Sequence, residues 1–473
     1  MPLINIKLKL AELKSKVNEY KLSPEIRALF DTLIILIEIL LQRQSKNSKN
    51  SSIPPSQDPN RIKNKSSGNG KKSGGQIGHK GFTLEKDPNP TEIITIKLDR
   101  RILPKGQKYT NSEPETRQVK DFEVKVTIVE YQAEVVTNEM GKRFVAEFPA
   151  NVNKAVQYGS NIKSNAVYMS HYQMCSLDRI EDNFLDQLNI KLSEGSIHNF
   201  SLEFYKKLMP WNTFVRKNLI GQNLLHADET GINVNRDNYW LHVLCNAKFT
   251  LFFAHSKRGK EAMDEMGVLP YFKGYLCHDH WKPYFSYLCT HVLCNAHHLR
   301  ELVYIEEIEK QIWAKKMREF LIQLNEEVKE KGGSLSVSKQ KKQIKKYFKI
   351  LKDGEEECPI AETVKGKRGR TKQSKSRNLL ERFKEFEKEI LNFMSNKTIP
   401  FTNNQGENDL RMTKVKLKVA GCFRSFLGAQ IFASIRGFIN TCKKNNINVT
   451  DAIKAVFDGK LNDIIVKVQN HAE

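Results

Sequence analysis

Three acidic residues that lie far apart in the sequence could share one metal-dependent reaction. Asp228 lies in an apolar, β-branched run that predicts a strand over 224–234, and Asp279 lies in a second such run over 274–281. Glu407 opens a basic segment that predicts a helix. Any one of them alone is more often a solvated surface carboxylate. Together, in a chain with a formal net charge of +23, they favour chemistry on a polyanion such as DNA.

The chemistry that suits such a trio is phosphoryl transfer. Cutting or joining a phosphodiester needs an activated water or 3′-hydroxyl and a stabilised leaving oxygen, and two Mg²⁺ ions about 3.5–4 Å apart can serve both. Mg²⁺ (or Mn²⁺) takes oxygen ligands and keeps several waters, so a few carboxylates are enough. We therefore expect Asp228, Asp279 and Glu407 to be catalytic and to hold the metal. The pattern alone does not decide between Asp228 and its neighbour Glu229.

Basic residues follow Glu407 in the same predicted helix. All of them lie C-terminal to the carboxylate and suit contacts to DNA phosphates. They are Arg411, Lys414, Lys416 and Lys418.

A second group of metal-binding residue types follows Asp279. Cys294, His297 and His298 lie close together in the sequence, with His278 and His280 upstream, and soft ligands of this kind favour zinc. The competing interpretation is a buried thiol with histidines on a helix face near the active site. We favour the second, so Cys294, His297 and His298 are structural or secondary candidates and zinc is not expected.

Composition limits the class of protein. A chain of 473 residues with 39% hydrophobic residues predicts two to four domains with a real core. The eight cysteines form no CxxC pair, which favours free thiols in a reducing cytoplasm over a disulfide framework. No signal peptide is expected, and the protein should be cytoplasmic, associated with the nucleoid when it binds DNA.

The first 46 residues predict a helix that pairs with a second copy. Ser23 is a suitable N-cap with Pro24 at the first helical position. An apolar run over 33–41 is about half the ~20 residues that a membrane span requires, and Glu38 interrupts it. Apolar residues that recur at alternating spacings of three and four form a heptad seam along this helix. The seam predicts a short dimerising coiled coil, and the alternative is a helix packed on its own domain. The seam residues are Ile26, Leu29, Leu33, Leu36 and Leu40.

Three regions of different composition follow. Residues 47–90 form a basic linker; from 43 to 81 there are nine Lys and Arg against one acid, so this arm either contacts DNA or is a plain linker. Residues 91–150 alternate apolar and polar and predict a small β-rich module. Residues 151–221 predict helices, in which 177–188 and 195–208 form either a helix-turn-helix or an ordinary helical hairpin.

The region 222–440 predicts the catalytic domain. Three consecutive strands, a helix and two further strands are the order expected of a ribonuclease H-like α/β core. From 303 to 400 the pattern is helical and highly charged, which predicts an insertion between the second aspartate and the glutamate. Residues 441–473 predict a helical tail.

These motifs, in this order, resemble transposases of the insertion sequence 66 family. The resemblance implies a DDE domain that cuts and transfers an insertion element, with Asp228 rather than Glu229 in the catalytic set. It also implies that Lys367, Arg368, Arg370 and Arg424 join the DNA-binding candidates. Its partners would be terminal inverted repeats, target DNA, further copies of the chain and small accessory proteins of the element. The matching stretches are 47–58, 74–81, 226–231, 274–281, 294–302, 366–370 and 403–425.

One departure from the family pattern affects the β-rich module. Family members usually carry CxxC pairs there, but no cysteine precedes Cys175, so a structural zinc is not expected in this region. The module then folds without metal, or this copy of the element is decaying. The alternative functions are an inactive DNA-binding relic and a ribonuclease H-like nuclease without strand transfer.

Overall fold

The computed structural model describes residues 9–10, 12–13, 15–17, 19–20, 22–51, 58–60, 84–149, 151–361, 371 and 373–470. The chain forms two compact units, residues 1–62 with 133–473 and residues 63–132. Three of the DNA-binding candidates, Lys367, Arg368 and Arg370, lie outside the described residues, as does most of the basic arm. Among the helices described, none is long and apolar enough to cross a membrane.

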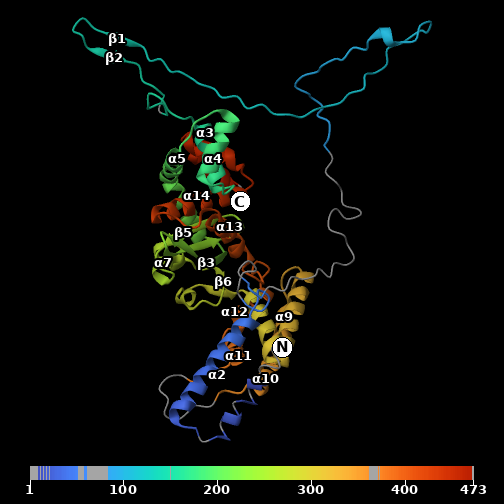
Figure 1. Ribbon diagram of the computed structural model, residues 1–473, viewed down its shortest axis with the longest axis vertical. Helices are drawn as coiled ribbons and strands as arrows, with labels where there is room; N and C mark the ends of the chain where they lie inside the picture. The colour runs from blue at the N-terminus through green and yellow to red at the C-terminus, as the bar shows by residue number, and fades with distance from the viewer. Residues whose placement is uncertain are drawn as a thin grey trace. The chain divides into compact units, whose positions relative to one another are not determined.

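A five-stranded mixed sheet stands at the centre of the larger unit, so the predicted α/β class is confirmed (Figure 1). Its strand order is β5-β4-β3-β6-β7. The first three strands are antiparallel neighbours, whereas β6 runs parallel to β3 and β7 parallel to β6. Asn235 and Arg236 both have positive φ, which matches the twist of a tight two-residue hairpin between β3 and β4. The strands are β3 (Leu224–Val234), β4 (Asp237–Cys245), β5 (Thr250–His255), β6 (Tyr275–His278) and β7 (Thr290–Leu293).

Helices cover the sheet because its strands are apolar on both faces. On β5, Leu251 and Phe252 are both buried, and α14 (Phe426–Lys444) packs against this strand. The contact is close at Gly437, where a Cβ atom would lie 3.1 Å from the carbonyl oxygen of Thr250. The helices that share a hydrophobic core with α14 are α3 (Ser160–His171), α4 (Leu177–Leu188), α5 (Glu194–Lys207), α6 (Met209–Ile220), α15 (Val449–Phe457) and α16 (Leu461–Asn470).

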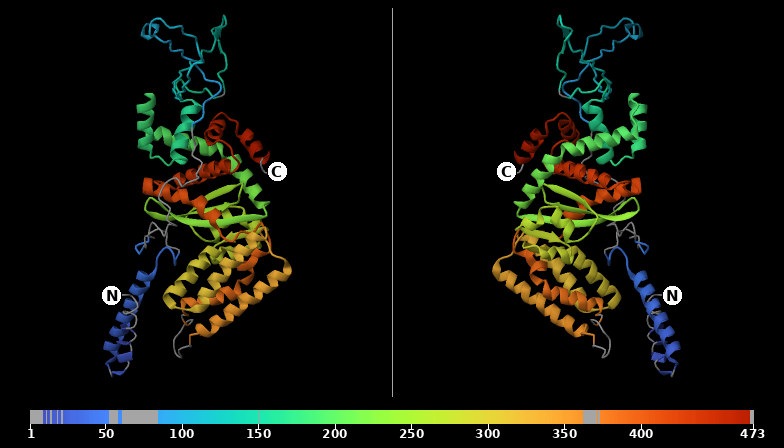
Figure 2. Two further views of the ribbon diagram at one scale, coloured as in Figure 1. Left: turned by 90° about the vertical axis from the view of Figure 1, so that its right-hand side faces the viewer. Right: turned by 90° about the vertical axis from the view of Figure 1, so that its left-hand side faces the viewer.

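A second hydrophobic core joins the helices between β7 and residue 400. It is built around Trp313, Tyr347 and Phe383, and it includes Val292 and Leu293 of β7. Figure 2 shows these helices in yellow and orange beside the green strands. Because they pack together, the long segment between Asp279 and Glu407 returns to the sheet. The helices are α8 (Asn295–Tyr304), η4 (Ile305–Glu309), α9 (Ile312–Glu330), α10 (Val337–Glu357), α11 (Lys375–Glu385), α12 (Glu387–Leu391) and η5 (Asn392–Met394).

The N-terminal helix is α2 (Pro24–Ser45), and Ser23 Oγ accepts a hydrogen bond from Ile26 N at its start. Ile34 and Leu41 pack with Leu10, whereas the predicted seam is exposed. The exposed fractions are 46% for Ile26, 70% for Leu29, 53% for Leu33, 52% for Leu36 and 58% for Leu40. Pairing of this face remains a prediction.

The region predicted as a β-rich module is less regular than expected. Among residues 84–149, the strands are two of three residues each, β1 (Val135–Thr137) and β2 (Arg143–Val145), and η1 (Arg100–Ile102) is the one helical turn. Elsewhere the chain is extended and exposes apolar side chains, with Ile96 at 91% and Ile128 at 95%. Alternating apolar residues predict strands, but strands persist only when a second layer buries their apolar face.

Candidate active site

Strands β3 and β6 bring Asp228 and Asp279 to the same level of the sheet. Their parallel register pairs His226 with Cys277, and two further residues along each chain lead to the two aspartates. Asp279 directly follows the last residue of β6, and its Oδ1 accepts a hydrogen bond of 3.0 Å from Trp281 N. Neighbouring parallel strands therefore align two carboxylates that the sequence separates.

Glu407 reaches the aspartates from the first turn of α13 (Asn404–Ala420). This helix packs against β3, and Gly406 lies close to the strand: a Cβ atom there would lie 3.4 Å from Asp228 Cβ. A glycine lets the helix approach the strand at this point, so Glu407 is held beside Asp228.

The buried residue Asn403 fixes the start of α13 on the strand. Its Nδ2 donates to the carbonyl oxygen of Ala227 at 2.8 Å, and its Oδ1 accepts from His226 Nδ1 at 2.8 Å. Its backbone N–H donates to Cys294 Sγ at 3.1 Å. Asn403 thus connects α13 to the two residues that precede the first aspartate and to the start of α8.

Two further contacts hold the rest of α13. Asp409 forms an ion pair of 2.6 Å with Lys444 of α14 and accepts a hydrogen bond from the Thr250 hydroxyl at 2.8 Å. Beyond the helix, Phe423 N donates to Asn233 O at 2.9 Å. Contacts of Asn403 before α13, Asp409 within it and Phe423 after it therefore fix the helix that carries Glu407.

The carboxylates share a crowded electrostatic environment. Burial raises the pKa of Asp228 well above its usual value, and the nearby charges of Glu229, Asp279 and Glu407 raise it further. Glu407 Oε1 is buried and has no hydrogen-bond partner among the described residues. A buried carboxylate oxygen in this state is costly unless a cation compensates it.

These residues fit a hard divalent cation because every donor in the trio is a carboxylate oxygen. Among the described residues, two groups of metal-binding side chains have ligand atoms that all lie within 4.8 Å of one another, and neither of these groups is the Asp228, Asp279 and Glu407 trio. The three catalytic candidates therefore spread wider than a single ion spans. Two ions about 3.5–4 Å apart reach across a wider set of carboxylates.

Glu229 lies on the opposite face of β3 from Asp228, as alternation along a strand predicts. Its carboxylate accepts two hydrogen bonds from Arg258, of 2.6 and 3.0 Å, and one of 2.5 Å from the Tyr284 hydroxyl. The Arg258 guanidinium is stacked on the rings of Trp240 and Trp281, at 4.7 and 4.3 Å from their centroids. Glu229 thus ties β3 to the segment after Asp279.

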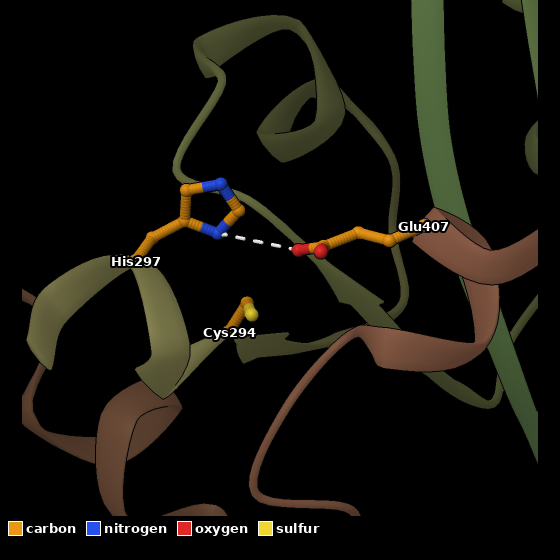
Figure 3. A group of neighbouring side chains, drawn as sticks. All are labelled: Cys294, His297 and Glu407. Carbon is orange, nitrogen blue, oxygen red and sulfur yellow. Dashed lines mark ion pairs between the residues drawn. The ribbon is translucent and has the colours of Figure 1, made fainter. Parts of the chain in front are cut away.

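The predicted Cys294, His297 and His298 group divides in the structure. Cys294 and His297 lie beside Glu407, as Figure 3 shows. His298 is buried instead against the Phe383 ring, and its Nδ1 is 3.1 Å from Asn295 Oδ1. His298 therefore belongs to the core of the helical region.

The described DNA-binding candidates differ in their surroundings. Lys414 is exposed, and its charge is close enough to Asp228 for each to affect the other. Lys416 is half-buried, and its charge acts on His171, a buried histidine of α3. Arg411, Lys418 and Arg424 are exposed. Lys414 is thus a candidate whose pKa is affected by the charge of Asp228.

Asn403, Asp409 and Arg258 are not among the site residues that the sequence predicts. Asn403 stands at an N-cap position, where asparagine ordinarily bonds to its own helix, but its side chain forms no such bond here. Its role depends on a strand far away in the sequence. No local signal identifies such a contact.

The sequence model of the transposase IS66 family matches residues 155–431. This range includes the five strands, the helical region, and all of Asp228, Asp279 and Glu407. A comparison with curated proteins gave no match. Because the match spans more than half of the 473 residues, the chain belongs to the IS66 family of transposases.

Proposed function

We propose that this protein is a DDE transposase that cleaves DNA strands at the ends of an insertion element and joins them to target DNA. The observation that carries the proposal is the convergence of Asp228, Asp279 and Glu407 from two strands and a helix. Family membership supports action on DNA, and the net charge of +23 suits a polyanionic substrate.

The strand order supports a ribonuclease H-like core. Three antiparallel strands are followed by two parallel ones, with β3 central and the proposed aspartates on β3 and directly after β6. In this proposal the helices between β7 and α13 are an insertion, and α13 supplies the third carboxylate.

The three carboxylates would hold Mg²⁺ or Mn²⁺. Such ions, when bound, lower the pKa of a water or 3′-hydroxyl and stabilise the leaving oxygen. The protein contributes rigidity: Asp228 is fixed by the β3 ladder, Asp279 by its bond to Trp281 N, and Glu407 by the anchored helix. Preorganised ligands of this kind need little rearrangement during the reaction.

Exposed cations of α13 are the proposed phosphate contacts next to the site. Arg411 and Lys414 follow Glu407 by four and seven residues, so they share its side of the helix. The hairpin of α4 and α5 is a weaker candidate for DNA recognition. Helix α4 carries four acids and a single Arg, which opposes approach to phosphates. The acids are Asp178, Glu181, Asp182 and Asp186.

A cleavage and strand-transfer assay tests the proposal. The full chain is incubated with Mg²⁺ and labelled DNA that carries the terminal repeats of its element. The transposase predicts both nicked ends and joined products, and Glu407→Gln should give neither while still retarding the DNA in a gel. Binding without cleavage by the wild type would support the inactive relic. Cleavage without joining would support a nuclease.

A further inference from the structure

The side chains of Cys294, His297 and Glu407 form a second group around one point. One ligand atom from each, a sulfur, a ring nitrogen and a carboxylate oxygen, lies within 4.8 Å of the other two. Figure 3 shows the imidazole and the carboxylate facing each other, with the thiol below them. The residues come from the start of α8 and the first turn of α13, which are distant in the sequence.

Two atoms of this group lack the partners that buried polar atoms normally have. His297 Nδ1 and Glu407 Oε1 are both buried without a hydrogen bond to any described residue, and they lie 3.9 Å apart. That separation is too long for a hydrogen bond. Two ligands of a tetrahedral ion at 2.0–2.1 Å would be about 3.3 Å apart, so a small closing movement would fit an ion between them.

The third ligand is a thiol at the start of α8. Cys294 is buried at the N-cap of α8, and its sulfur accepts the Asn403 backbone N–H at 3.1 Å. Burial raises the pKa of the Cys294 thiol, so the sulfur keeps its proton while no metal is bound. Cation binding would release the thiol proton to the buffer.

We propose that Cys294, His297 and Glu407 form a site for a thiophilic divalent cation such as Zn²⁺, with water as the fourth ligand. A sulfur, a nitrogen and an oxygen suit zinc or cobalt and not magnesium, which prefers oxygen alone. The sequence favoured a buried thiol with helix-face histidines over a zinc site formed by Cys294, His297 and His298. The tertiary structure replaces His298 with Glu407.

Occupancy of this site has a consequence for catalysis. Glu407 belongs to both sets of ligands, so a bound zinc ion would withdraw an oxygen from the proposed magnesium set. Zinc would then compete with magnesium and hold the transposase inactive. This consequence rests on the proposed function, whereas binding of the ion does not.

Cobalt absorption tests the site without an activity measurement. The full-length protein, freed of metal and kept reduced, is titrated with Co²⁺. We expect a thiolate-to-cobalt charge-transfer band that saturates at one equivalent and is removed by Zn²⁺ but not by excess Mg²⁺. Cys294→Ser should lack the band, and His297→Asn should weaken cobalt binding at least about 10-fold.

Two matched variants complete the experiment. Cys422→Ser removes a half-buried thiol just beyond the far end of α13 and should keep the band. Asp228→Asn removes a ligand of the proposed magnesium set and none of the cobalt ligands, so it should also keep the band. The cobalt band is therefore expected whether or not the protein proves to be an active transposase. No band in the wild type, a band that persists in Cys294→Ser, or one that His297→Asn leaves at full affinity would overturn the site. His297 is half-exposed, so its variant provides a test even where Cys294→Ser folds poorly.

Discussion

The side-chain amide of Asn403 donates a hydrogen bond of 2.8 Å to the carbonyl oxygen of Ala227, the residue immediately before Asp228. The same side chain accepts a bond from His226, so one buried amide joins the strand of the first carboxylate to the helix of the third. The distance between Asp228 and Glu407 is therefore controlled by a residue that need not touch DNA.

Asn403→Ala should loosen this connection. The loss of two buried hydrogen bonds should lower the free energy of unfolding by about 1–3 kcal/mol. Cleavage should fall by about 100-fold, because small displacements of catalytic groups cost that much, and the Mg²⁺ concentration for half-maximal rate should rise. DNA affinity should not change. The control is Asn404→Ala, which truncates an exposed neighbour on the same helix. Equal effects of the two variants would refute the positioning role.

Asp228→Asn should stabilise the metal-free protein while abolishing cleavage. Burial and the neighbouring acids raise the pKa of Asp228, so its ionised form is disfavoured in the folded state. A neutral side chain of the same shape removes that cost at neutral pH. Thermal unfolding in EDTA should show a higher midpoint for the variant, and added Mg²⁺ should stabilise the wild type more than the variant. A lower midpoint in EDTA would show that the carboxylate has a structural role instead.

Lys414→Ala should weaken binding to all DNA sequences by about the same factor. Loss of one phosphate contact should reduce the slope of log affinity against log salt by about 1. Fluorescence anisotropy over a range of salt concentrations measures this slope. Lys339→Ala on α10 removes an exposed lysine that pairs with Glu327, outside the site, and serves as the control. An unchanged slope in Lys414→Ala would remove this residue from the DNA interface.

Acid should destabilise the fold through buried histidines. Burial lowers the pKa of His242 on β4 from 6.5 to about 4, and its Nδ1 has no hydrogen-bond partner in the described chain. Between these two values the unfolded state binds a proton that the folded state does not, so stability is present above about pH 6.5 and falls as the pH drops. The slope is about 1.4 kcal/mol per pH unit for each such group. Urea denaturation from pH 7.5 downward should give a shallower loss for His242→Gln, and an identical slope would contradict this assignment.

Leu33→Glu should disrupt self-association of the chain. Leu33 is 53% exposed on α2, and an exposed apolar seam of this kind suits a coiled-coil partner. Sedimentation equilibrium of the full-length protein at micromolar concentration should show a dimer or larger assembly that Leu33→Glu weakens. Ala28→Glu places the same charge on α2 outside the seam and should have little effect. A monomeric wild type would exclude this role for the seam.

The sequence determined the secondary structure around the site because its signals are local. Runs of apolar and β-branched residues predicted the strands that hold Asp228 and lead to Asp279, and the basic segment after Glu407 predicted the helix. Each of these patterns reflects the period of a strand or helix, which neighbouring residues set between themselves. The same reasoning failed for residues 91–150, because alternation predicts a strand only where another layer buries it.

Only the tertiary structure decided which side chains meet. Alternation places Asp228 and Glu229 on opposite faces, but the packing of α13 determines that Asp228 faces Glu407 while Glu229 pairs with Arg258. In the same way, the packing of α8 directs His298 into a core and leaves Cys294 and His297 beside Glu407. The contacts of Glu407 with Asp228, Cys294 and His297 join residues more than 100 positions apart in the chain. Their partners are chosen by burial and packing, which no local pattern records.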